Sequence, residues 1–198
     1  MYSLIAGMLI PLKPGISGIT PSSVTTGERV QFIIEGYNSH YKAGEESFRA
    51  WIKIDSIHAF TPKKVTVYND RNLALEFLIP GYLPNNQKRK SCALILDNAI
   101  DGPSILPDAM VIKQDSVAPI HEGQAWEKTL LEDVHSLNSL RFPFRNLLKE
   151  TIRNLYYHVS LWFALLFLLV AANYHGIQYL RTSDLMHDLK SSAYTQVA

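Results

Sequence analysis

The sequence predicts a mainly β chain: an antiparallel two-sheet sandwich, then an amphipathic helix, then one C-terminal transmembrane helix. Three observations support this prediction. Short strand patterns follow one another between residues 14 and 113, and an amphipathic stretch comes after them. The uncharged stretch from Asn154 to Leu180 is then long enough for a helix to cross a hydrocarbon core of about 30 Å. A chain of 198 residues has room for one ordinary domain and such an anchor.

Residues 1–13 form an apolar N-terminal segment. The segment is too short to span a membrane, it lacks the basic start of a signal peptide, and no small-residue cleavage site follows it. Two interpretations stay open, namely the remnant of a targeting segment and a first strand.

Residues 14–113 alternate between short apolar strands and turn signals. Arg29 to Glu35 and residues 48–55 alternate apolar and polar side chains with the period of two that is typical of a half-buried strand. Further strands are expected at residues 16–20, 65–68, 73–79, 91–96 and 105–112. Because no helical periodicity separates them, the region favours an antiparallel sandwich. The single cysteine, Cys92, excludes an intrachain disulfide and is expected to be a small buried residue.

Several short motifs in this region resemble an IPT/TIG-type immunoglobulin-like domain. They are Gly18–Val24, Gly27–Val30 and Ile34–Asn38 at the opening, with Leu75–Pro80 and Ala109–Ile112 as a later pair of strands. The resemblance implies an immunoglobulin-like sandwich that serves adhesion, spacing or protein contact, usually outside the cytoplasm. The Cys…Trp…Cys pattern of antibody-type domains is missing.

The composition changes after the last strand. Residues 114–125 are typical of a linker, and residues 126–154 predict amphipathic juxtamembrane helices, the second of which begins at Pro143. The apolar stripe of that second helix contains Phe144, Leu147, Leu148, Ile152 and Leu155. Such a stripe lies on a bilayer surface or docks a protein, so we predict that Phe144, Leu147, Leu148 and Ile152 bind a partner.

Residues 155–180 predict the transmembrane helix, whose centre reads VSLWFALLFLLVAA. Aromatic residues lie toward both ends, as in the aromatic belts of membrane helices: Tyr156, Tyr157, Trp162, Tyr174 and Tyr179. The alternative is a buried helix of a globular domain, but no other part of the chain is large or apolar enough to surround it. Residues 181–198 are a polar tail, expected to be a small helix or disordered.

The sequence gives conflicting indications of sidedness. Basic residues are more frequent before the span than after it, which by the positive-inside rule places the sandwich in the cytoplasm. The immunoglobulin-like resemblance favours the opposite side, and the basic residues also suit anionic headgroups. We expect an extracytoplasmic sandwich and keep the cytoplasmic side as the alternative.

Motifs for catalysis and metal binding are missing from the sequence. There is no phosphate-binding glycine loop, no HExxH and no GxSxG, and Cys92 lacks the neighbours of a copper site. Glu132 and His135 form one Glu-x-x-His pair, whereas a di-iron bundle needs two. A formal net charge of +1 argues against a nucleic acid partner. The sequence therefore predicts a protein that is not an enzyme.

Two histidines and two side-chain amides fall within the predicted span, and such residues are costly unless they face protein or a cofactor. They are His158, Asn173, His175 and Gln178. Ala171 precedes His175 by four residues and leaves space for a flat macrocycle, a spacing similar to that of pigment-ligating helices in photosynthetic antennae. His175 and His158 are therefore candidate ligands of a haem or a (bacterio)chlorophyll, with contacts to headgroups or to another helix as the alternative. Asn173 and Gln178 are expected to bind a partner helix.

These observations predict a non-catalytic accessory or scaffolding subunit of a larger membrane complex. It would contact other integral membrane subunits, and the bilayer, through the sandwich and the juxtamembrane and transmembrane helices. Two alternatives remain. One is a free-standing, membrane-tethered binding module, and the other is a haem- or chlorophyll-carrying subunit of an electron-transfer or photosynthetic complex.

Overall fold

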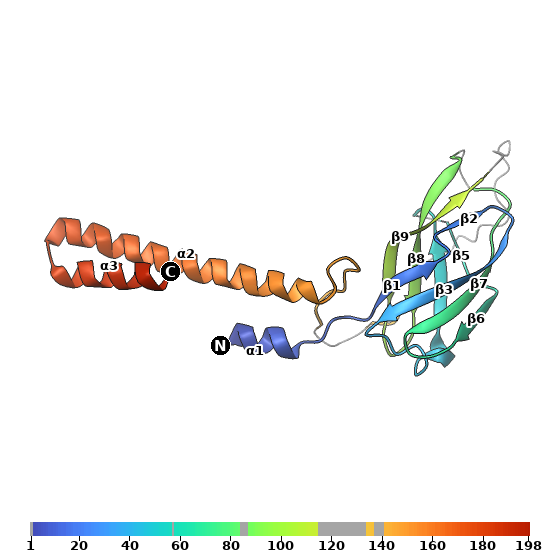
Figure 1. Cartoon of the computed structure of the whole chain (residues 1–198), viewed down its shortest axis with the longest axis horizontal. Helices are drawn as coiled ribbons and strands as arrows, with labels where there is room; N and C mark the ends of the chain where they lie inside the picture. Colours follow the sequence, from blue (N-terminus) through green and yellow to red (C-terminus); the bar gives the residue numbers. More distant parts are fainter. Residues whose placement is uncertain (1, 57, 84–86, 115–133, 137–140) are drawn as a thin grey trace. The chain divides into compact units, whose positions relative to one another are not determined.

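A computed structural model of the chain describes residues 2–56, 58–83, 87–114, 134–136 and 141–198 (Figure 1). The chain forms two compact units. The sandwich unit consists of residues 12–149, and the helical unit combines residues 1–11 with residues 150–198. The sandwich is thus inserted in the sequence between two parts of the helical unit.

The sandwich unit contains two β-sheets. The four-stranded sheet has the order β1 (Gly15–Thr20), β3 (Arg29–Tyr37), β7 (Asn72–Leu78) and β6 (Lys64–Val67), and all its pairs are antiparallel. The five-stranded sheet has the order β2 (Ser23–Thr25), β9 (Ser104–Lys113), β8 (Arg89–Asp97), β4 (Arg49–Lys53) and β5 (Ala59–Phe60). In this second sheet β2 runs parallel to β9 and the other pairs are antiparallel. A short 3-10 helix, η1 (Glu45–Ser47), precedes β4.

Both sheets contribute alternate side chains to one apolar core. Phe32 of β3 and Phe77 of β7 are fully buried, with ring centroids 5.8 Å apart, and Phe60 of β5 lies 5.3 Å from Phe77. The five-stranded sheet adds Ile52 and Leu94. The predicted two-sheet β structure is therefore confirmed, except that the β2–β9 pair makes one sheet mixed. Helix and strand have nearly equal shares of the structure, so "mainly β" describes the sandwich unit and not the whole chain.

The chain enters and leaves the sandwich unit at adjacent positions. Leu12 and Phe142 form a parallel β-bridge, and the Lys13 N–H donates to the Phe142 carbonyl at 2.7 Å. The Phe144 ring stacks on Tyr37 at 5.3 Å and lies so close over Gly15 that a Cβ there would overlap it. Phe144 is therefore part of the sandwich unit.

The predicted helix that begins at Pro143 is wrong. Residues 146–148 form a turn, and a 3-10 helix, η2 (Lys149–Thr151), leads into α2 (Ile152–Thr182). Lys149 adopts a left-handed conformation with φ 43°, which a continuous α-helix does not allow. The first predicted juxtamembrane helix falls largely on residues 126–133 and 137–140, which lie outside the described residues, and residues 134–136 have no regular structure.

The helical unit contains α1 (Tyr2–Leu9), the long α2, and α3 (Leu185–Val197). The N-terminal segment is thus a helix and not a first strand. Arg153 of α2 binds the C-terminal end of α1: the Nη1 of Arg153 donates to the carbonyls of Gly7 at 2.5 Å and Ile10 at 2.7 Å. At the other end Ser183, with φ 55°, stops α2, and the Asp184 side chain caps α3 by accepting from the Met186 N–H. The tail expected to be a small helix or disordered is helical.

Candidate functional sites

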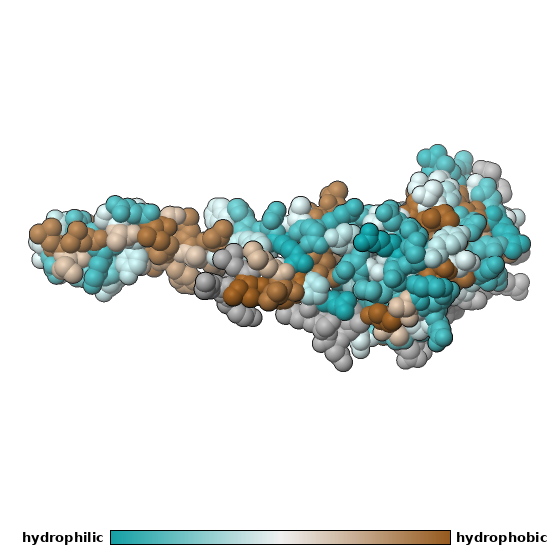
Figure 2. Space-filling model, turned by 60° about the horizontal axis from the view of Figure 1, so that its bottom comes forward, coloured by the Kyte–Doolittle hydropathy of each residue, from teal (hydrophilic) through white to brown (hydrophobic). Residues whose placement is uncertain are grey.

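Over residues 161–167, helix α2 exposes apolar side chains around its whole circumference. It is, among the helices of the described ranges, the one long and apolar enough to cross a membrane. Phe167 is 72% exposed, and the neighbouring exposed residues include Leu161, Trp162, Phe163, Leu166 and Val170. These positions follow one another along the helix, so no single face contains them all. Figure 2 shows apolar residues, in brown, along the helical unit.

Of the two histidines and two amides predicted within the span, three have partners inside α2. His158 accepts a hydrogen bond from the Trp162 indole N–H at 2.9 Å. Asn173 donates to the Leu169 carbonyl at 3.0 Å, one turn earlier, and Gln178 donates to the Tyr174 hydroxyl at 3.4 Å. These bonds reduce the cost of placing the side chains in an apolar environment without a partner helix.

His175, the fourth, contacts α3, which packs antiparallel on the C-terminal half of α2. The Nδ1 atoms of His175 and His187 are 2.9 Å apart, and the His175 ring stacks on Tyr194 with a centroid distance of 5.7 Å. Ser191 adds a hydrogen bond to the Ala172 carbonyl at 2.9 Å. Two neutral imidazoles share such a contact when one carries its proton on Nδ1 and the other on Nε2. The arrangement matches the alternative in which His175 contacts another helix, here of the same chain, and the haem or chlorophyll hypothesis stays a prediction.

The predicted partner-binding stripe is not continuous. Phe144 packs on the sandwich, Leu147 in the following turn is 96% exposed, and Ile152 begins α2. Leu147 and Leu148 are therefore the exposed apolar residues of this stripe in the sandwich unit. Asn173, in contrast, is an exposed residue of the helical unit.

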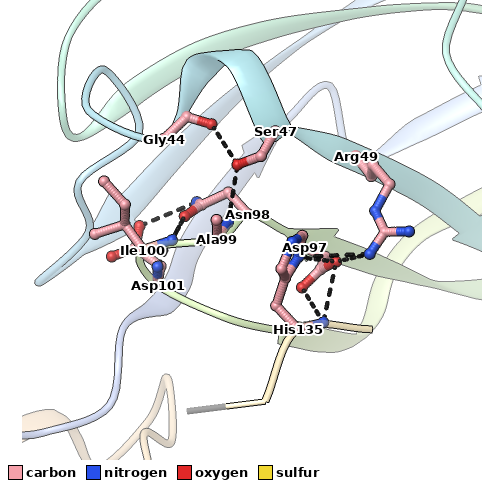
Figure 3. A network of polar contacts seen from close by, with 9 residues as sticks. All are labelled: Gly44, Ser47, Arg49, Asp97, Asn98, Ala99, Ile100, Asp101 and His135. Atoms are coloured by element: carbon pink, nitrogen blue, oxygen red, sulfur yellow. Dashed lines mark hydrogen bonds and ion pairs between the residues drawn. The ribbon is translucent and has the colours of Figure 1, made fainter. Parts of the chain in front are cut away.

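The sandwich unit contains a polar cluster around a buried carboxylate, which the sequence did not predict (Figure 3). Asp97, at the end of β8, is fully buried and lies opposite Arg49 of β4. Arg49 Nη2 contacts Asp97 Oδ2 at 2.5 Å, and His135 reaches the same carboxylate with its backbone N–H at 3.2 Å and its Nδ1 at 2.9 Å. Arg49 also lies over the Trp51 ring at 5.5 Å. The cluster holds residues 134–136 against the outer face of the five-stranded sheet.

The turn after β8 continues this polar network. The Asn98 side chain accepts from the backbone N–H groups of Ile100 and Asp101 at 2.9 and 2.8 Å. The buried Asp101 accepts from the His40 backbone N–H at 2.8 Å and contacts its Nδ1 at 2.9 Å. Ser47 donates to the Gly44 carbonyl and accepts from the Ala99 N–H, so its hydroxyl is already used within the turn.

The described part of this network contains serine, histidine and aspartate, but it does not bring the serine hydroxyl to a histidine base. A hydroxyl nucleophile needs a base within hydrogen-bond reach, and the recorded partners of Ser47 are backbone groups. The Cys92 thiol is buried, which raises its pKa to about 12 and keeps it protonated. Burial also raises the pKa of Tyr41. No three His, Cys, Asp or Glu side chains of the described ranges come together as a metal site, and Glu132 of the Glu-x-x-His pair lies outside those ranges.

A polar hollow lies on the outer face of the four-stranded sheet. Ala74 forms part of its floor, and the remaining lining comes from Arg29, Val30, Gln31, Lys64, Thr66 and Glu76. Arg29 forms an ion pair with Glu76. The hollow is open and its charges are largely paired, which is typical of a solvated sheet face.

Comparisons with known proteins add little to these sites. No family model matches the chain, and no curated protein matches it. Among solved structures, the chain is similar to a superoxide reductase (neelaredoxin) from Ignicoccus hospitalis, with 11% identity over 56% of this chain and 86% of that chain. The TM-score of 0.34 is too low for the similarity to support an argument about fold or chemistry.

Proposed function

We propose that this protein is a single-pass membrane protein and a non-catalytic accessory subunit of a larger membrane complex. The observation that carries the proposal is the exposure of apolar side chains on all sides of α2, exemplified by Phe167 at 72%. Each exposed side chain of that size costs about 1.5–3 kcal/mol in water relative to an apolar environment. A bilayer, or partner helices within one, removes this cost.

The sandwich is, in this proposal, an IPT/TIG-type immunoglobulin-like domain that contacts other proteins. Two observations motivate the proposed fold: two sheets share one apolar core, and the short opening motifs lie in β1 to β3. The recorded polar clusters hold the fold together and offer no reactive group. The site that faces partners includes Leu147 and Leu148 of the exposed turn and Asn173 of α2.

We place the sandwich on the extracytoplasmic side. The basic flank before the span includes Arg153, whose guanidinium is bonded to Glu150 and to two α1 carbonyls. Counted by the positive-inside rule this flank favours the cytoplasmic side, and the extracytoplasmic placement is motivated by the immunoglobulin-like resemblance instead. Arg145 and Lys149, the nearest basic neighbours of this flank, suit anionic headgroups on either leaflet.

The test is purification of the full chain from the membranes of its own organism in a mild detergent, with the subunit bands and the visible spectrum read together. Stoichiometric partner bands are expected, together with resistance of the protein to extraction by alkaline carbonate. Extraction by carbonate would contradict membrane insertion. A lone, colourless band would favour the free-standing binding module.

Matched variants then locate the partner surface. Leu147→Asp and Leu148→Asp are expected to lower the yield of partner bands at unchanged abundance of this chain, since each places a charge in an apolar contact. Asn146→Asp introduces the same charge in the same turn and is expected to have no effect. If all partner bands persist in the leucine variants, the proposal that Leu147 and Leu148 bind a partner subunit is wrong. A visible band that disappears in His175→Ala would establish the pigment-carrying alternative.

A further inference from the structure

Helix α3 turns His187, Ser191 and Tyr194 toward α2 and leaves its larger apolar side chains exposed together with several polar ones. His187, Ser191 and Tyr194 face α2 and make the recorded contacts with it. The apolar residues point away from α2 and are exposed: Leu185 at 68%, Met186 at 56%, Leu189 at 61% and Val197 at 74%. In water a helix buries its apolar stripe against its neighbour and exposes its polar face.

The helix periodicity supports this division. Residues 185, 189 and 197 repeat at intervals of four and eight, so they share one face, with Met186 beside it. Residues 187, 191 and 194 repeat at intervals of four and three and share the opposite face. The exposed apolar side chains therefore lie on one side of α3, with the small Ala193 between Leu189 and Val197.

The contact with α2 fixes where this surface lies along the helix. Ser191 bonds to the carbonyl of Ala172, and α3 runs antiparallel to α2. The residues that follow Ser191 therefore lie beside the apolar turns of α2 that precede Ala172. If those turns of α2 cross the hydrocarbon core, the second half of α3 lies at the same depth.

The charged residues of the helical hairpin formed by α2 and α3 are positioned so that the second half of α3 can lie in the hydrocarbon core. Asp184 caps α3, Asp188 and Lys190 lie in its first half near the turn, and Arg181 lies in the last turn of α2 at the same end. Residues 191–197 carry no charge. Charged groups can therefore remain at headgroup level while the uncharged half of α3 enters the acyl chains.

We infer that α3 is a re-entrant helix whose stripe of Leu185, Met186, Leu189 and Val197 contacts the acyl chains of the bilayer, while its polar face bonds to α2. This inference rests on the membrane insertion in the proposed function and goes beyond it. The hairpin then presents lipid with an apolar surface on both helices and conceals the two histidines between them.

The test uses the full chain in phosphatidylcholine vesicles with single cysteines that carry an environment-sensitive fluorophore. Native Cys92 is buried with a raised pKa and leaves the background unlabelled, which the unsubstituted chain checks. The variants are Leu185→Cys, Leu189→Cys and Val197→Cys on α3. Phe167→Cys is the lipid-exposed control, and Glu46→Cys on the sandwich is the water-exposed control. Quenchers attached to the lipid, either near the headgroup or deep in the acyl chain, report the depth of each label.

We expect the label at Val197 to be quenched by the deep quencher as strongly as that at Phe167, and the label at Leu185 by the shallow one. Their separation along α3 is about 18 Å, from twelve residues at 1.5 Å each. Equal, shallow quenching would mean that α3 lies flat on the surface, and no quenching that it lies in water or under a protein; each result overturns the inference. Met186→Cys replaces Leu185→Cys should that variant fail to fold. An unquenched label at Phe167 would instead refute membrane insertion itself, so the two failures are distinguishable.

Discussion

The sandwich unit buries its large apolar residues, whereas the helical unit exposes many of its own. In the sandwich, Phe32 and Phe77 are fully enclosed by side chains of both sheets, and even the carboxylate of Asp97 is buried, bonded to the partly exposed Arg49 and His135. In the helical unit, residues of the same kind, such as Phe167 and Leu180, are exposed, and the bonds between helices are made by polar groups. The difference is what the proposed membrane insertion predicts, namely a different solvent for each unit. Water stabilises the first by exclusion, whereas the second relies on apolar surroundings.

The largest expected effect comes from removing one phenylalanine from each unit. Phe77→Ala leaves a cavity beside Phe32 and Phe60, so the free energy of unfolding of the sandwich should fall by about 3–5 kcal/mol. Phe167→Ala removes an exposed side chain and should change it by less than about 0.5 kcal/mol. Urea unfolding of the full chain in detergent, followed by near-ultraviolet circular dichroism, measures both. Equal losses would remove the distinction between the units.

The ion pair between the buried Asp97 and the partly exposed Arg49 gives the next largest effect. Asp97→Ala leaves Arg49 without its buried partner and releases His135, so we expect a loss of about 3 kcal/mol. Lys42→Met is the matched control, because Lys42 pairs with Glu45 on the surface of the same unit and such pairs contribute less than about 1 kcal/mol. The same urea titration compares the two. A loss of the same size in both variants would show that burial of the carboxylate has no energetic role.

Within the helical unit, Arg153 provides a smaller, local test. Arg153→Met removes the two hydrogen bonds to the end of α1, and the amides of residues 2–10 should exchange about tenfold faster or more, consistent with about 1.5 kcal/mol for bonds to a charged group. Arg145→Met removes a similar charge from the neighbouring turn. Hydrogen exchange read by mass spectrometry should find no change in α1 for that variant. Unchanged exchange after Arg153→Met would mean that α1 is held by other contacts.

The smallest effect is the pH dependence that Cys92 introduces. Burial raises the pKa of its thiol from 9.0 to about 12, so the folded state keeps a proton that the unfolded state loses. This contribution to stability is fully present below about pH 9 and falls between about pH 9 and pH 12. Relative to Cys92→Ala, the unfolding free energy should drop by about 1 kcal/mol between about pH 8 and pH 10. Parallel pH profiles for the two proteins would contradict a buried thiol.

Local patterns predict the strands well, because alternation and turn residues act over short stretches. The predicted strand at 29–35 became β3, and that at 73–79 became β7. The three-residue β2 and the two-residue β5 have no such pattern, since they are held by pairing with β9 and β4. The long α2 is equally local in origin, because a run of uncharged apolar residues defines it.

The candidate sites were harder to predict because distant residues form them. Asp97 meets Arg49 through the register of β8 and β4, and His135 comes from a segment with no strand or helix pattern. The predicted helix at Pro143 failed for a related reason, since Phe144 gains more by stacking on Tyr37 and covering Gly15 than by continuing a helix. The pairing of His175 with His187 depends on the turn at Ser183, whose left-handed backbone reverses the chain.

The bridge between Leu12 and Phe142 has a consequence for how the protein is assembled. The chain enters and leaves the sandwich unit at adjacent residues. A different domain whose two ends are equally close could therefore replace this unit without changing the separation of the two connecting segments. A force applied to the two connecting segments would also act on the same end of the sandwich, at the bridge between Leu12 and Phe142.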